Sequence, residues 1–275
     1  MIAAIVTSAI MQWNLQIGTT NTLHFTTIYR SHDTGSDDGQ TNGRTYPLSA
    51  LGTTFKGLSI QQLRTPGTAL RFEIVHQEGT LTFTGHSLSN AATGDFTYAL
   101  DPSFAANLEK RGTGRPTERM QFEWLIAGAD VYALLDAVSA AGFPTPNVTE
   151  IKKAVDHDVT ADYLRGLAST GMHPASLEKT ITAVDHDVTP QGIRSMQAYG
   201  FHALTLDQAI TLVDHDVTPK YLDGLSKLGY HVTPDQAVRM VDHDVTIAYI
   251  EQLRTKGYSN LSVNDLIRLA DHDVH

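Results

Sequence analysis

The residues best suited to chemistry in this chain of 275 residues are five Asp-His-Asp triplets in its C-terminal half. Carboxylates and imidazoles are common metal ligands, and calcium accepts carboxylates and carbonyls in irregular shells. The first aspartate of each triplet is therefore a candidate calcium ligand: Asp156, Asp185, Asp214, Asp242 and Asp271. A zinc site would need several ligands about 2 Å from one ion, and triplets about 9 Å apart do not converge in this way.

The triplets belong to an internal repeat, because their first aspartates follow one another at steps of 29, 29, 28 and 29 residues. Each unit has the apolar spacing of two short helices. Thr189 and Thr218 suit the N-cap of a second helix. Four glycines suit the left-handed position after that helix: Gly171, Gly200, Gly229 and Gly257. Helices this short are unstable alone, so the repeat predicts an α-solenoid of helical hairpins of about 29 residues.

Residues 1–100 follow a different period, in which apolar and polar residues alternate as in half-buried strands. We expect an antiparallel β domain here, either a sandwich or an open barrel, with a hairpin turn at Glu78-Gly79. The solenoid then covers residues 101–275, with degenerate units over 101–146 and clear units from about 147. The predicted fold class is α+β. Glu73 and Glu78 flank His76 and are interpreted as a solvated strand face.

Composition excludes several classes of function. The formal charge of −10 leaves no basic surface for nucleic acid, and the absence of cysteine excludes disulfides and thiolate metal sites. The apolar start, residues 1–12, fits either a strand or a remnant export signal and is too short to span a bilayer. No nucleophile elbow, phosphate loop or dinucleotide motif is present. We therefore expect no enzyme activity, no cofactor beyond the candidate calcium, and no transmembrane span.

Two stretches carry a resemblance to a known group of proteins: "TGDFTYALDPSF" (93–104) and the repeated "DHDVT…GY" units. The chain resembles bacterial exported or membrane-anchored proteins of unassigned function, in which a small β domain precedes "DHGVTPEY"-type helical units. Similar units are appended to some β-lactam-sensor-type metallopeptidases. This chain lacks the His-Glu-x-x-His motif of those peptidases, so the resemblance implies architecture and a bacterial envelope or extracellular setting, and no peptidase activity.

The resemblance also gives the triplets a structural interpretation. The relatives have His-Gly-Val where this chain has His-Asp-Val, so the second aspartate takes the place of a left-handed glycine after a helix, a conformation that aspartate tolerates. The histidine before it lies at the helix C-terminus. The residues concerned are His157, Asp158, His186, Asp187, His215, Asp216, His243 and Asp244. The first aspartate is either solvated or bonded to the cap of a neighbouring unit, and the calcium interpretation stays open beside this one.

For function, the sequence favours a non-enzymatic scaffold that binds a protein partner on its solenoid surface. A second hypothesis is head-to-tail self-assembly into a filament or oligomer. In that case the apolar segment 1–17 adds as a strand to another subunit, and the open solenoid end at "DHDVH" is covered by a neighbour. A third hypothesis is a calcium-binding repeat module.

Overall fold

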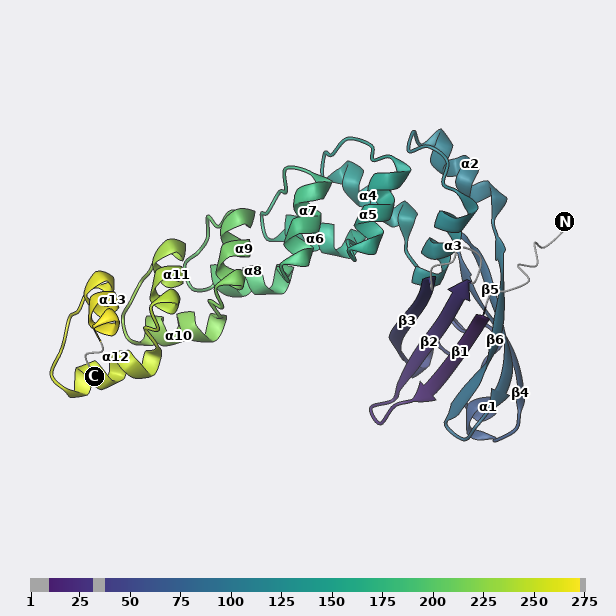
Figure 1. Cartoon of the computed structure of the whole chain (residues 1–275), viewed down its shortest axis with the longest axis horizontal. Coiled ribbons are helices and arrows are strands. Elements are labelled where there is room, and N and C mark those ends of the chain that lie inside the picture. Colours follow the sequence, from purple (N-terminus) through teal and green to yellow (C-terminus); the bar gives the residue numbers. More distant parts are fainter. Residues whose placement is uncertain (1–9, 32–37, 273–275) are drawn as a thin grey trace. The chain divides into compact units, whose positions relative to one another are not determined.

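The computed structural model describes residues 10–31 and 38–272, and its fold class is α+β, as predicted (Figure 1). The chain divides into two compact units. The first comprises the chain up to Val131 together with Pro146–Thr149, and the second comprises Tyr132–Thr145 and the chain from Glu150 onward. The sequence pattern places the change at residue 100, but the first two long helices after the sheet belong to the first unit.

The first unit is built on one antiparallel sheet of six strands in the order β3-β2-β1-β6-β5-β4. The strands are β1 Ile10–Ile17, β2 Thr22–Ser31, β3 Asp38–Pro47, β4 Ala69–His76, β5 Gly79–Ser87 and β6 Ala91–Leu100. All six lie in a single sheet, so the described residues do not form the two layers of a sandwich. β3 and β4 are its edges.

Apolar residues alternate along the strands and cover one face of this sheet. Trp13, Phe25, Phe72 and Phe83 lie at the centre of that face and pack mostly edge to face. The covering elements are the 3₁₀ turn η1 Leu48–Ala50 and the helices α1 Ile60–Arg64 and α3 Glu118–Ala127. The helix α2 Pro102–Lys110 follows β6, and its Phe104 packs against Trp124 of α3. Phe122 of α3 belongs to the same buried cluster as Trp13, which is why α3 groups with the sheet.

The apolar start of the chain enters this core. β1 lies between β2 and β6 and is paired with both, so residues 10–17 form a strand, one of the two alternatives that the sequence allows. The export-signal alternative concerns residues 1–12, of which residues 1–9 lie outside the described residues.

Two glycines let β5 and β6 approach unusually closely. Gly85 and Gly94 face each other in the register, and a Cβ added to either would lie 2.0 Å from a carbonyl oxygen of the other strand. Trp13 of β1 lies opposite Gly94 of β6 in the register, and its indole N–H donates to the carbonyls of Thr84 and Asp95, both at 3.1 Å. The indole therefore occupies the space beside the side-chain-free glycine pair.

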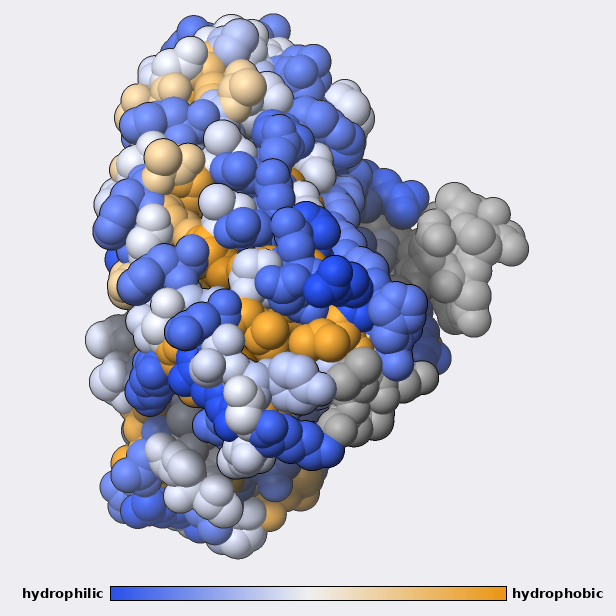
Figure 2. Space-filling view, turned by 90° about the vertical axis from the view of Figure 1, so that its left-hand side faces the viewer, coloured by the Kyte–Doolittle hydropathy of each residue, from blue (hydrophilic) through white to orange (hydrophobic). Residues whose placement is uncertain are grey.

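The second unit consists of short helices that begin and end in a repeating way. They are α4 Val131–Ala140, α5 Val148–Asp156, α6 Ala161–Ser169, α7 Leu177–Asp185, α8 Pro190–Gln197, α9 Leu206–Asp214, α10 Pro219–Lys227, α11 Pro234–Asp242, α12 Ile247–Thr255 and α13 Val263–Asp271. In each 29-residue repeat, an odd-numbered first helix is joined to an even-numbered second helix. First helices of consecutive repeats contact each other, as α9 does with α11 and α11 with α13. Second helices do the same, as α6 does with α8, α8 with α10, and α10 with α12. In the space-filling view, hydrophobic side chains emerge in bands between hydrophilic ones (Figure 2).

Threonines and glycines punctuate these helices. Thr189 and Thr218 are N-caps, and their hydroxyls accept the amide N–H of Gly192 at 3.0 Å and of Tyr221 at 3.2 Å. The glycines after the second helices have positive φ, which avoids the steric cost that a Cβ would add there. The φ values are 80° for Gly171, 102° for Gly200, 81° for Gly229 and 91° for Gly257.

We predict that Gly94→Ala destabilises the sheet unit by about 3 kcal/mol, because the new Cβ would collide with a backbone carbonyl that no side-chain rotation can move away. Gly43→Ala in β3 is the matched control, since its Cβ would come no nearer than 3.7 Å to the Thr26 hydroxyl. Urea unfolding followed by tryptophan fluorescence measures both. Equal stability of the two variants would contradict the close approach of β5 and β6.

Candidate functional site

In each 29-residue repeat, a short turn joins the first helix to the second. The second aspartate of the triplet lies in this turn and forms the C-terminal cap of the first helix. After α5, Asp158 has a φ of 56°, and its N–H donates to the carbonyl of Val155 at 3.1 Å. The N–H of Val159 then donates to the carbonyl of Ala154 at 2.9 Å, which completes the Schellman arrangement. Val159 is buried, so the cap also adds to the core. The equivalent Asp187, Asp216 and Asp244 all have a φ of 55°.

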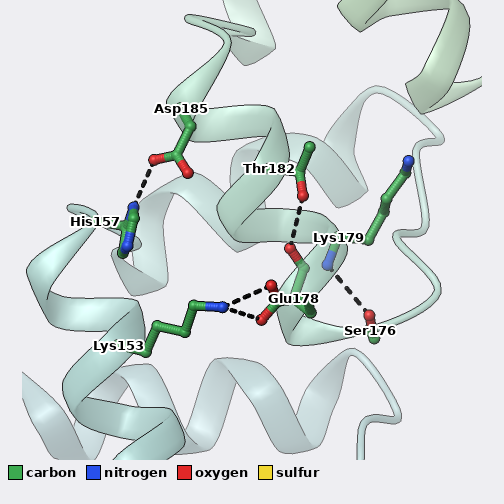
Figure 3. Close-up of polar contacts among 7 residues, drawn as sticks. All are labelled: Lys153, His157, Ser176, Glu178, Lys179, Thr182 and Asp185. Carbon is green, nitrogen blue, oxygen red and sulfur yellow. Dashed lines mark hydrogen bonds and ion pairs between the residues drawn. The ribbon is translucent and has the colours of Figure 1, made fainter.

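In the first four triplets, the histidine contacts the first aspartate of the next triplet. In the first such pair, His157 Nδ1 lies 2.6 Å from Asp185 Oδ1 (Figure 3). The same contact recurs in His186–Asp214 at 2.7 Å, His215–Asp242 at 2.6 Å and His243–Asp271 at 2.6 Å. The triplets therefore join consecutive units. The signal was present in the sequence, because a histidine and the aspartate 27 or 28 residues later recur together.

The chemistry of these pairs fixes where the proton lies. An ionised carboxylate only accepts hydrogen bonds, so the imidazole Nδ1 must carry the shared proton. The four histidine side chains are 38–42% exposed and the four aspartate side chains 41–45% exposed. At this exposure solvent screens the attraction, and each pair contributes about 1 kcal/mol or less.

Asp156, in the first triplet, has a different partner. No triplet histidine precedes it, and Lys152 one turn earlier on α5 holds its carboxylate, with Nζ–O distances of 2.8 and 3.0 Å. A second contact joins α5 to α7 beside the histidine pair: Lys153 Nζ lies 2.6 and 2.7 Å from the two oxygens of Glu178 (Figure 3). Lys179 of α7 contacts Asp207 of α9 in a related way.

The candidate calcium ligands are thus separated along the repeat, one to a unit. Across residues 10–31 and 38–272, no three side chains of the His, Asp or Glu type come together as a metal site would require. In Asp185, Asp214, Asp242 and Asp271, one carboxylate oxygen already accepts a hydrogen bond from histidine. A calcium ion at any of them would need further oxygen ligands from elsewhere.

Tyrosines form a second link between units, which the sequence interpretation missed. The Tyr163 hydroxyl of α6 donates to the carbonyl of Val188 at 2.7 Å, and the Tyr221 hydroxyl of α10 donates to that of Val245 at 2.7 Å. Both acceptors lie in the aspartate-capped turn of the following unit. Burial raises the pKa of Tyr163 and of Tyr221 to about 12, so both hydroxyls keep their protons at neutral pH.

Small residues set the closest approach between consecutive second helices. A Cβ on Gly166 would lie 2.7 Å from the ring of Pro190, and a Cβ on Gly224 would lie 2.6 Å from the side chain of Ile247. Pro190 and Ile247 are the first residues of α8 and α12. The sequence signal was the recurrence of small residues 29 residues apart, at 166, 195 and 224.

The sheet unit contains one acidic residue whose environment the sequence interpretation misjudged. Glu78 is wholly buried in the β4–β5 turn, whereas the sequence suggested a solvated face. Its main-chain carbonyl accepts the side-chain N–H of Gln121 at 2.7 Å and the main-chain N–H of Asp101 at 2.8 Å, which hold the turn against α3 and the start of α2. Burial raises the pKa of Glu78 to about 7.

His76 lies next to this turn, in a small polar hollow. Burial, and then the nearby Arg44 guanidinium, lower the pKa of His76, and Asp130 partly offsets them. The hollow shared with Arg44 and Tyr46 has a volume of about 20 Å³, which is room for about one water molecule.

Comparison of the chain with family models, curated proteins and solved structures finds no match. Among the described helices, none is both long enough and apolar enough to cross a bilayer.

We predict that the His186–Asp214 pair couples two neighbouring 29-residue repeats by about 1 kcal/mol. A double-mutant cycle with His186→Ala and Asp214→Ala would measure this coupling in urea unfolding. The coupling should shrink at high salt, because the pair is partly exposed. A matched cycle on His186 and Asp207, which are not hydrogen-bonded to each other, should give no coupling. Equal coupling in both cycles would contradict a specific pair.

We predict that Glu78 makes stability fall as pH rises. Its pKa of about 7 in the folded chain exceeds the ordinary value of 4.5, so the folded state binds the proton more tightly. Its contribution is complete below pH 4.5 and is lost as pH rises through about 7. Glu78→Gln should therefore match the parent near pH 4.5 and exceed its stability near pH 8 by on the order of 3 kcal/mol. Denaturant unfolding at both pH values measures this, and a constant difference between the two proteins would contradict the assignment.

Proposed function

We propose that the helical unit is an α-solenoid of 29-residue hairpins and that the protein is a non-enzymatic scaffold that binds a protein partner. One observation carries this proposal: the repeated polar side chains, the histidine–aspartate pairs above all, join each unit to the next. Residues committed to bonds between units build a framework, and solenoids of this kind use their extended surface for recognition.

The variation of exposed residues supports the same function. Positions that join units repeat closely, whereas an exposed position early in the second helices carries a different residue in each unit. That position is occupied by Asp162, Gln191, Lys220 and Ala248. A constant framework with a varied surface is what recognition of one specific partner needs, because specificity depends on differences between contacts.

Self-assembly remains a second candidate, in a narrower form. Residues 10–17 are an inner strand of the chain's own sheet, so they are not available to a neighbouring subunit. The other half of the hypothesis rests on α13, where Val263, Leu269 and Ala270 are only partly buried. A copy of the chain that packed against α13 would cover this helix.

Calcium binding is the third candidate, and it rests on the row of carboxylates alone. The resemblance to bacterial envelope proteins supports a bacterial envelope or extracellular setting for any of the three.

Light scattering behind a sizing column, in EDTA and then in calcium, tests the proposal. We predict a particle of 30.0 kDa in both buffers. A mass several times larger in both buffers would replace the scaffold by a self-assembling subunit. A mass that changes with calcium would favour the calcium module.

Replacing the first aspartates by asparagine separates the structural and calcium hypotheses further. We predict that Asp185→Asn, Asp214→Asn and Asp242→Asn together lower the melting temperature by only a few degrees, because the amide oxygen still accepts the histidine N–H. For the parent and for this triple variant alike, the melting temperature in calcium should equal that of the same protein in EDTA. A calcium-dependent rise in the parent that is lost in the variant would contradict the framework role.

A further inference from the structure

A pocket of about 130 Å³ opens between α4 and α6. Each of these is the second helix of its hairpin, and they come first along the helical part of the chain. The walls of the pocket include Ala137, Ala140 and Ala141 on the α4 side and Leu164, Arg165 and Ala168 on the α6 side. The turn after α6 adds His173 to the lining. Most of the lining residues are apolar, and Arg165 and His173 are the polar residues among them.

Between the next two second helices, α6 and α8, side chains occupy the position that is open in this pocket. Between α6 and α8, the Gln197 side-chain N–H donates to the carbonyl of Thr170 at 2.8 Å. Beside it, Arg194 Nη1 donates to the Ser169 hydroxyl at 3.3 Å. The contacts of these two residues bridge the two helices.

One repeat of 29 residues earlier, alanine replaces three of the four residues that form this bridge. Ala168 stands where Gln197 stands, Ala141 where Thr170 stands, and Ala140 where Ser169 stands. Arg165 is the counterpart of Arg194 and turns to Asp162 on its own helix at 3.0 Å. The pocket is therefore the volume that a glutamine side chain and its partners occupy in the following unit.

We propose that this pocket binds a glutamine side chain of a partner polypeptide, which rests on the scaffold function proposed above. The side-chain N–H of the bound glutamine donates to the Ala141 carbonyl, as Gln197 does to Thr170. Its amide oxygen faces the Arg165 guanidinium, and its methylene groups lie against the alanines. A pocket of this size admits one side chain, since a cavity of about 150 Å³ takes up a single benzene ring.

A second comparison within the chain selects a neutral side chain over a cationic one. Between α10 and α12, the bridge is made by Arg254, which donates to the carbonyl of Leu228. There the residue in the repeat position of Arg165 is the acidic Glu251. Between α6 and α8 that position is the basic Arg194, and the bridge is the neutral Gln197. The pocket has the basic Arg165 at this position, as the α6–α8 pair has Arg194, so the side chain that it accepts should be neutral like Gln197.

The test is methyl NMR on the full chain with labelled alanine, titrated with N-acetylglutamine methylamide. We expect saturable shifts of the Ala137, Ala140, Ala141 and Ala168 methyls, with the glutamate and arginine analogues at least fivefold weaker. Glutamate lacks the N–H for the Ala141 carbonyl, and arginine meets the charge of Arg165. Absence of saturable shifts at these methyls, or equal binding of all three analogues, would overturn the proposal.

Filling the pocket from within provides an independent test. Ala168→Gln should abolish the shifts at the remaining lining alanines and raise the melting temperature by about 2 °C, because the new side chain makes the bridge itself. Ser226→Gln is the matched control at the equivalent position two units later and should leave probe binding unchanged. An unchanged or lower melting temperature of Ala168→Gln would show that the pocket does not accept a glutamine side chain.

These results separate the pocket from the scaffold. Saturable, glutamine-selective shifts on a particle much larger than 30.0 kDa would keep the pocket and reject the monomeric scaffold. A particle of 30.0 kDa without such shifts would reject the pocket and keep the scaffold.

Discussion

Each helix of the second unit depends on its neighbours, because the helices have at most ten residues and helices that short are barely stable in water. Stability must therefore come from contacts between units, and each contact has to fit the repeat. The buried stripes supply the larger part, since burial of a leucine or isoleucine contributes about 2 kcal/mol. The polar contacts between units add less energy, but they need a defined geometry and so fix the register of one unit on the next.

The two aspartates of a triplet have opposite relations to the helix that they end. The second adopts a left-handed conformation that glycine would reach more easily, but aspartate leaves the unfolded chain less freedom than glycine does. The first lies in the last turn, where the helix dipole disfavours a negative charge. The histidine of the preceding unit, or Lys152 in the case of Asp156, places a proton or a positive charge against that carboxylate. The repeat thus places a hydrogen-bond donor beside a carboxylate that its own helix does not favour.

Local structure could be predicted from the sequence, because helix caps and apolar spacing depend only on residues that are close together in the chain. The strand over residues 10–17 and the helix that begins after Asp101 could both be read from neighbouring residues. Contacts between units were harder to read. The histidine and its aspartate partner are 27 or 28 residues apart, and spacing alone does not tell a bonded pair from a shared solvated edge. The burial of Glu78 was beyond sequence reasoning, because it depends on where α3 packs against a turn more than 40 residues away.

Departures from the repeat are more informative than the repeat itself. Where a residue bonds one repeat to the next, that bond is a sufficient reason for the residue to recur. Ala168 is different, because its place in the following unit is taken by a residue that bridges two helices. Nothing in the packing of α6 requires alanine there, since the side chain is exposed and the space beside it is open. An internal repeat supplies its own comparison set, so a missing bridge can be recognised within this single chain, and the pocket that it leaves is where a ligand is expected to bind.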